Sequence, residues 1–145
     1  SSPRTRGGAV TLAAVNIAQQ LDVNFICTFT QSGDSARRLC RLRPSKPILA
    51  FTPDPKVAAF MALFWGVQAV VDQKAQSTDE MLAEVDRYLI SKGMATKDEM
   101  IVMTAGSPMG VAGSTNMVRA HRVGDLDDNG APVPEEHEKL GPYRD

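Results

Sequence analysis

A segment rich in hydroxyl groups and glycine is the first place where this sequence could bind a ligand. It runs from Phe29 to Ala36, between a predicted strand and a predicted helix. Backbone N–H groups at the start of a helix attract anions such as phosphate, and hydroxyl side chains add donors. The simpler interpretation is that Ser32 or Asp34 caps the helix and Gly33 permits the turn. The carboxylate of Asp34 favours this simpler interpretation, because a fixed negative charge repels phosphate.

A second candidate segment, residues 106–115, has the sequence GSPMGVAGST and follows the fourth predicted strand. It lacks the lysine of a phosphate-binding P-loop, and it has neither the spacing nor the following helix of a dinucleotide-binding turn. Such a loop can fold over a ligand or simply connect two strands. In an open α/β sheet, ligands bind beyond the carboxyl ends of the strands, where the strand order reverses. We therefore expect the two segments to form opposite walls of one pocket if the first and fourth strands are neighbours. The candidate ligand-binding residues are Thr30, Gln31, Ser32, Gly33, Asp34, Ser35, Ser107, Pro108, Met109, Gly110, Val111, Ala112 and Gly113.

No complete catalytic site is evident in the sequence. His121 falls in a predicted edge strand and His137 in the C-terminal tail, and neither has an evident Ser or Cys nucleophile beside it. We expect the carboxylates outside the tail to be scattered over helix surfaces. Cys27 and Cys40 lack C-x-x-C spacing, so we expect two reduced thiols packed in the core rather than a disulfide or a zinc site. We therefore predict no catalytic residue, no metal site and no turnover by this chain alone.

Strands and helices alternate along most of the chain. Hydrophobic spacing and capping signals predict helices over 8–21, 35–43, a stretch that begins near residue 55 and stops at Gly66, and 78–92. Strands are predicted over 23–29, 48–51, 67–71, 100–104 and 116–123. This alternation is typical of βαβ units with right-handed crossovers and a largely parallel sheet covered on both faces. The last strand follows without a helix, so we expect it to be antiparallel and, with Arg119, His121 and Arg122, at a sheet edge.

Length and composition fit one globular domain. The chain has 145 residues, of which 43% are hydrophobic and 23% charged, and a formal net charge of -1, which provides no global attraction to nucleic acid or an anionic membrane. We divide it into a linker at 1–7, a domain at 8–123 and an acidic, proline-containing tail at 124–145. The linker-like start, which does not begin with Met, suggests a piece of a longer protein. We expect Phe60, Phe64 and Trp65 to pack in the core. We expect Arg37, Arg38, Arg41 and Arg43 to form a basic helix face beside the first loop.

Several blocks of the sequence resemble the C-terminal alpha/beta domain of pyruvate kinases, bacterial members in particular. They are residues 28–37 (TFTQSGDSAR), Arg43–Pro44, residues 47–52 (PILAFT), Gly66–Val67 and the late block from Gly106 to Asn116. The resemblance implies a three-layer α/β/α sandwich around a five-stranded mixed sheet whose last strand is antiparallel. It also implies an effector pocket in which Thr30 to Ser35 takes the phosphate of a sugar phosphate or nucleotide, and Ser107 to Gly113 closes over it.

The same resemblance implies where chemistry and assembly occur. Phosphate transfer from phosphoenolpyruvate to ADP, with Mg²⁺ and K⁺, belongs in this cytoplasmic family to other domains, so no cofactor is expected here. The last strand would pair with its copy in a neighbouring subunit, although Arg119 and Arg122 could instead protect the edge. Asp34 stands where the family commonly has arginine, and the closing loop has no basic residue and no tryptophan. The alternative functions are a stand-alone binding domain for small molecules and a Rossmann-like enzyme. The predicted interface residues are Asn116, Met117, Val118, Arg119, Ala120, His121 and Arg122.

Overall fold

A computed structural model describes residues 5–73, 75–106 and 115–124 of the chain. The described chain begins with helix α1 (Arg6–Gln20), and the first βαβ unit follows as strand β1 (Ile26–Phe29), helix α2 (Asp34–Arg41) and strand β2 (Ile48–Thr52). Helix α3 (Pro55–Met61), strand β3 (Val67–Val71) and helix α4 (Thr78–Ser91) follow. The chain then forms strands β4 (Met100–Gly106) and β5 (Thr115–Arg122). Every predicted helix and strand is therefore present, with ends that differ by a few residues.

The five strands form one sheet in the order β3-β2-β1-β4-β5. The pairs β1–β2, β1–β4 and β2–β3 are parallel, whereas β4–β5 is antiparallel. The prediction of an antiparallel last strand at the sheet edge is confirmed, as is the expectation that the first and fourth strands are neighbours. We call the side where β1 to β4 end the carboxyl edge, and the side where they begin the amino edge.

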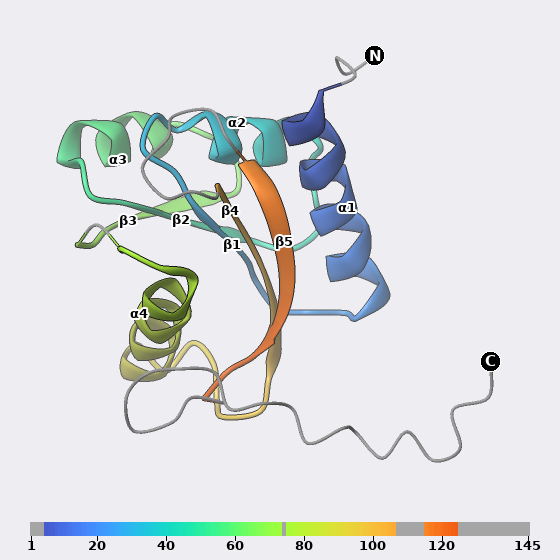
Figure 1. Cartoon of the computed structure of the whole chain (residues 1–145), viewed down its shortest axis with the longest axis vertical. Coiled ribbons are helices and arrows are strands. Elements are labelled where there is room, and N and C mark those ends of the chain that lie inside the picture. Colours follow the sequence, from blue (N-terminus) through green and yellow to red (C-terminus); the bar gives the residue numbers. More distant parts are fainter. Residues whose placement is uncertain (1–4, 74, 107–114, 125–145) are drawn as a thin grey trace.

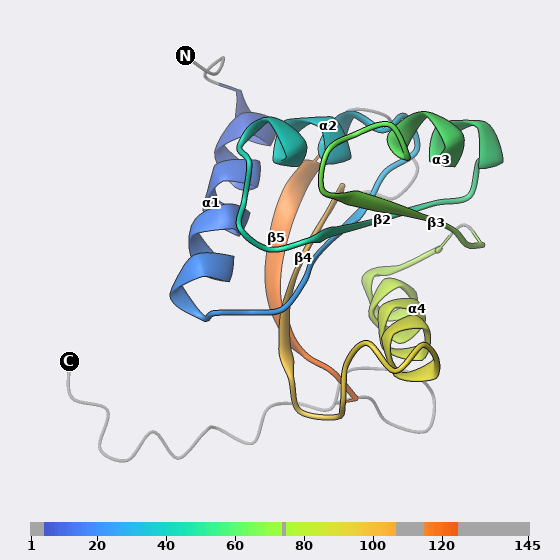
Figure 2. The same cartoon turned by 180° about the vertical axis from the view of Figure 1, so that it is seen from behind.

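Helices cover the two faces of the sheet unequally (Figures 1 and 2). On one face, Ala14 and Ala18 of α1 and Leu39 of α2 pack against the first residues of β1 and β2. Met61 of α3 extends this layer over Ala50. On the other face, α4 covers the larger apolar cluster. That cluster joins Met81, Leu82, Val85 and Leu89 of the helix to Cys27, Leu49, Phe51, Ile101 and Met103 of the sheet.

Local signals explain where the helices begin. The Ser77 side chain accepts a hydrogen bond from the N–H of Glu80 and caps α4. The Asp54 carboxylate accepts from the N–H of Lys56, and Pro55 occupies the first position of α3, where its missing N–H costs nothing. The capped helix starts lie at the carboxyl edge, where short connections join β2 and β3 to the helices that follow.

The expectation that three aromatic side chains fill the core is wrong for two of them. Phe60 is 48% exposed and Trp65 57% exposed, and only Phe64 is partly buried against the core. Phe60 lies within α3 but is not among its buried residues, which are Ala58 and Met61. For Trp65 the reason is that α3 ends at Met61, one turn earlier than the apolar spacing predicts. Trp65 therefore lies in the turn before β3 rather than on the inner face of a helix.

No helix within the described ranges is long and apolar enough to cross a membrane.

Candidate functional site

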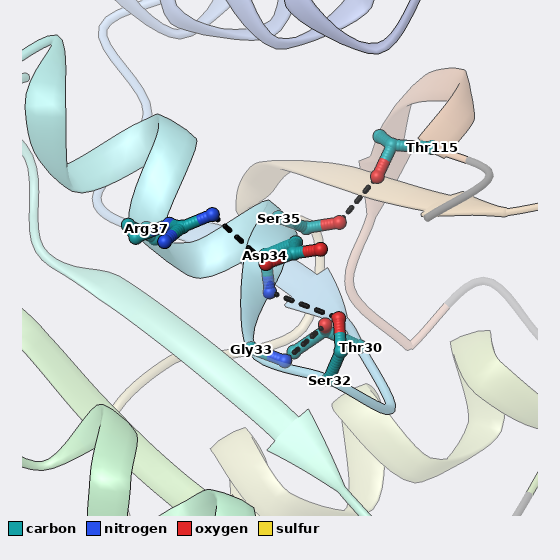
Figure 3. A network of polar contacts seen from close by, with 7 residues as sticks. All are labelled: Thr30, Ser32, Gly33, Asp34, Ser35, Arg37 and Thr115. Carbon is teal, nitrogen blue, oxygen red and sulfur yellow. Dashed lines mark hydrogen bonds and ion pairs between the residues drawn. The ribbon is translucent and has the colours of Figure 1, made fainter. Parts of the chain in front are cut away.

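The start of α2 lies at the carboxyl edge, beside the beginning of β5. Figure 3 shows the hydroxyl loop, which we define as residues 30–35, together with Arg37 and Thr115. The loop follows β1, while β4 ends at Gly106 next to β1 and β5 begins at Thr115. Sheet order therefore brings the hydroxyl loop close to both ends of the second candidate segment. Residues 107–113 of that segment lie outside the described residues, so their predicted contacts stay predictions.

Two backbone N–H groups of the loop already donate hydrogen bonds to hydroxyl groups within it. The Thr30 hydroxyl accepts from the N–H of Gly33 at 2.9 Å, and the Ser32 hydroxyl accepts from the N–H of Asp34 at 3.2 Å. Gly33 is the N-cap residue, with a φ of 90° that favours glycine, and no side chain caps the helix from this position. The N–H groups of Ser35 and Ala36 belong to the first turn, where a helix offers no internal acceptor. This end of α2 thus keeps donors that an anion could use.

The charge of Asp34 has a partner in the same helix. Its carboxylate accepts a hydrogen bond from the Arg37 guanidinium at 3.1 Å, and both side chains are nearly half exposed. Such an exposed ion pair contributes little to stability, and either partner can exchange it for another ion. Arg37 therefore offsets part of the repulsion that Asp34 exerts on an anion, which the sequence pattern alone did not reveal.

A buried contact joins the loop to the last strand. The hydroxyls of Ser35 and Thr115 are hydrogen-bonded, although the two residues lie 80 positions apart in the sequence (Figure 3). Both residues are buried, with exposures of 6% and 5%. Arg38, one turn after Ser35, lies against the start of α1, where a Cβ on Gly7 would be 2.0 Å from its Nη1 atom. The starts of α1, α2 and β5 therefore meet at this corner of the carboxyl edge.

The predicted basic face is only partly beside this loop. Of the four arginines, Arg37 lies in the first half of α2, while Arg38 and Arg41 lie in its last turn. Arg43, in contrast, follows the end of that helix, and its guanidinium lies 4.8 Å from the centroid of the Trp65 ring. The prediction that Arg43 lies beside the loop is therefore wrong. The helix α2 ends before Arg43, so this residue lies at the amino edge.

A buried polar cluster at the other end of β5 was missed by the sequence analysis. Nε2 of His121 lies 2.8 Å from Oδ1 of Asp86, and the second carboxylate oxygen accepts from the N–H of Gly124 at 2.9 Å. The His121 and Asp86 side chains are only 3% and 6% exposed. Asp86 follows Leu82 by four residues, so its place on the apolar face of α4 was the available signal. The expectation that carboxylates lie on helix surfaces is wrong for Asp86 and also for Glu84, which is 9% exposed.

The two cysteines differ in their burial. Both are free thiols; Cys27 is buried as expected, whereas Cys40 is only partly buried rather than fully packed in the core. Burial, with a smaller effect of the Asp86 charge, raises the pKa of the Cys27 thiol far above its usual range, so this thiol stays protonated and unreactive. Within residues 5–73, 75–106 and 115–124, no group of three or more His, Cys, Asp or Glu side chains could hold a metal ion.

The outer edge of β5 can be assigned from the register. The N–H of Val102 donates to the carbonyl oxygen of Phe25, so the backbone N–H of Val102 faces β1 and points away from β5. Val102 is paired with Ala120, and Thr104 with Val118. Because paired residues of an antiparallel ladder either both bond across it or both point outward, Val118 and Ala120 direct their N–H groups away from β4. These are the donors that an added strand would meet.

The fold defines a three-layer α/β domain with the hydroxyl loop at the switch in strand order. Comparison with known proteins identifies the family to which this α/β domain belongs. The family described as "Pyruvate kinase, alpha/beta domain" matches residues 8–121. The chain therefore belongs to the pyruvate kinase family, as its C-terminal alpha/beta domain.

Named relatives agree with this assignment. The chain is 46% identical over 123 residues to a pyruvate kinase of Corynebacterium efficiens, which covers 85% of this chain and 26% of the relative. It is 42% identical over 125 residues to a pyruvate kinase of Mycobacterium tuberculosis, covering 86% of this chain and 26% of that protein. The chain thus spans about a quarter of the length of these relatives.

Solved structures support the fold. A crystal structure of Cryptosporidium parvum pyruvate kinase matches with a TM-score of 0.72 and 21% identity, covering 85% of this chain and 23% of the other. The pyruvate kinase of the same organism in complex with ADP matches with a TM-score of 0.75 and 23% identity, covering 85% and 25% of the two chains. At this level of identity, the likeness shows a shared fold.

Proposed function

We propose that this chain is the regulatory and assembly domain of a pyruvate kinase. The observation that carries the proposal is the corner where the hydroxyl loop at the start of α2 meets the first residue of β5. An anionic effector, a sugar phosphate or a nucleotide, binds there through the first-turn N–H groups of α2 and the Arg37 guanidinium. Family membership favours this function over a stand-alone binding domain.

The catalytic reaction belongs to the parent enzyme, which in this proposal is a cytoplasmic glycolytic transferase. It passes a phosphate from phosphoenolpyruvate to ADP with the help of Mg²⁺ and K⁺. The donor set in the described part of this chain does not fit such ions, because no cluster of three or more ligating side chains is present there. We therefore expect the purified chain to make no pyruvate from these substrates. Turnover above a buffer blank in a coupled assay, in protein free of contaminating kinase, would contradict this expectation.

The effector site is tested by calorimetry with a sugar phosphate such as fructose 1,6-bisphosphate. The substitution Asp34→Arg removes a repelling charge and adds a bidentate phosphate donor. Two favourable changes of about 1 kcal/mol each would tighten binding roughly thirtyfold. A matched control is Asp54→Arg, which makes the same change at the exposed cap of α3 and should leave the affinity unchanged. Equal affinity of Asp34→Arg and wild type, or ligand contacts away from residues 30–35, would remove the site from the proposal.

Assembly is tested through the outward N–H groups of β5. The substitution Ala120→Pro deletes a donor that points away from β4, so it should weaken a dimer joined across a two-fold axis and leave the domain folded. Arg119→Pro is the contrasting change, because the parity of the ladder directs that N–H toward β4 and its loss should destabilise the fold. Sedimentation of the wild type at micromolar concentration should show a dimer, and a monomer across that range would refute assembly by the isolated chain.

A further inference from the structure

A pocket at the amino edge lies away from the hydroxyl loop, at the other end of α2. It is a cavity of about 280 Å³ between the end of α1 and the connection from α2 to β2. This volume is close to the lower limit of the range that small-molecule sites occupy in proteins. The lining residues are Val15, Ala18, Gln19, Ile26, Leu42, Arg43, Pro44, Ser45 and Lys46.

The inner part of this amino-edge pocket is apolar. Ala18 and Ile26 are buried in the core cluster beneath α1, and Val15 packs against the same cluster. Pro44 is buried as well, while Leu42 is half-buried at the end of α2. A ligand that reaches these side chains needs an apolar body, because no hydrogen bond compensates a polar group placed against them.

Two cations stand at the polar side of the pocket. The Lys46 side chain is only 26% exposed, and its Nζ donates to Oδ1 of Asp22 at 2.7 Å. The Asp22 side chain is 87% exposed, and its pKa is lowered by the hydrogen bond and the charge of Lys46. An ion pair with one partner so exposed is weak, so a carboxylate that also gains burial can compete with it. The Trp65 ring beneath the Arg43 guanidinium limits the freedom of the second cation.

The backbone conformation of Asp22 and Arg43 is unusual for residues other than glycine. Asp22 has a φ of 49° and Arg43 a φ of 48°, and each lies just after the capping residue of a helix. Glycine is the usual residue at this helix-terminating position, since a side chain there costs about 1 kcal/mol. The sequence instead has charged side chains at both positions, and Arg43 lines the pocket.

We propose that the amino-edge pocket binds a small organic monoanion, with its apolar body against Val15 and Leu42 and its carboxylate between Lys46 and Arg43. The charges of Arg43, Lys46 and Asp22 leave one net positive charge, which matches one carboxylate. The carbonyl ends of α1 and α2 also face this edge, and their partial negative charge opposes any anion, so the attraction in this site comes from the Lys46 and Arg43 side chains. The site is independent of the effector corner, because none of its residues belongs to the hydroxyl loop.

The test uses benzoate and its uncharged amide, benzamide, as a matched pair of probes with the full chain. In two-dimensional ¹H–¹⁵N NMR titrations, benzoate should shift the backbone signals of Ala18, Leu42 and Ser45 saturably. Benzamide should bind at least tenfold more weakly, which corresponds to about 1.4 kcal/mol. Shifts confined to residues 30–35, or equal affinity for the two probes, would overturn the proposal.

Two substitutions separate the pocket from general charge effects. Lys46→Gln removes the partly exposed ammonium and should weaken benzoate binding about tenfold while leaving benzamide unchanged. Lys56→Gln, an exposed residue at the start of α3, changes the net charge equally and should have no effect. Benzoate affinity that falls equally in both variants would show attraction to overall charge and would overturn the proposed site. Thermal unfolding of each variant verifies that the fold is retained.

Discussion

The two ends of β5 are fastened to the helices by different chemistry. At its first residue, Thr115 meets α2 through a contact between two uncharged hydroxyls. At its far end, His121 and Gly124 share the carboxylate of Asp86 in α4, with distances of 2.8 and 2.9 Å. The side chains at both ends are buried, so the main difference between them is one of charge.

This contrast separates a strong attachment from an adjustable one. A buried carboxylate that loses its donor leaves an uncompensated charge, whereas a hydroxyl that loses its partner leaves only a neutral polar group. The Asp86 end therefore fixes β5 to α4. The Thr115 end, next to the proposed effector corner, can exchange its partner at lower cost. A ligand at the hydroxyl loop would act on the end of the strand that is easier to move.

The largest expected effect is at the charged end. His121→Leu keeps the volume but leaves the Asp86 carboxylate with the single N–H of Gly124, so the free energy of unfolding should fall by about 3–5 kcal/mol. His121→Gln can still donate from its amide and should recover a clear part of that loss. Urea denaturation measures both variants. A loss below about 1 kcal/mol for His121→Leu would show that the two ends are equivalent after all.

A second carboxylate in α4 tests whether pairing, rather than burial, makes the difference. Oε2 of Glu84 is buried with no hydrogen-bond partner in the described part of the chain. Burial, and then the negative charge of Asp72, raise the pKa of Glu84 from 4.5 to about 7. The folded state therefore holds this proton more tightly than the unfolded state, so stability falls as pH rises through this window.

The matching variant is Glu84→Gln, which cannot ionise. The difference in unfolding free energy between this variant and wild type should grow in favour of the variant from pH 4.5 to 7. Denaturation curves at several pH values measure this difference, with Asp79→Asn, an exposed residue of the same helix, as the control. A difference that stays constant across the window would show that Glu84 is already paired.

The smallest expected effect is at the neutral end. Thr115→Val removes one hydroxyl and should cost about 1–2 kcal/mol, because the Ser35 hydroxyl loses its partner. Thr104→Val provides the comparison, since Thr104 donates to Thr28 at 2.8 Å in the buried interior of the sheet. Equal costs in chemical denaturation would show that both are ordinary buried hydroxyl pairs. A cost for Thr115→Val as large as that for His121→Leu would contradict the contrast between the two ends.

Much of the architecture followed from local patterns. Alternation of helical and strand spacing predicted the nine elements of the described residues, and the missing helix before residue 116 predicted the antiparallel last strand. The end of α3 was not predictable in this way, because the apolar spacing continues past Met61 while the helix does not. Asp86 was misjudged for a related reason. A carboxylate looks solvent-exposed in sequence unless its distant partner, here His121, is known.

The sequence by itself determined the class of this domain, since the order of apolar and capping residues requires strands connected by helices. The same residues carried the resemblance to the pyruvate kinase family. Tertiary structure alone decided which distant groups meet. Thr115 reaches Ser35 only because β4 and β5 are placed beside β1 in the sheet. Local patterns specify which face of an element is apolar, but strand order depends on long-range packing across the whole core.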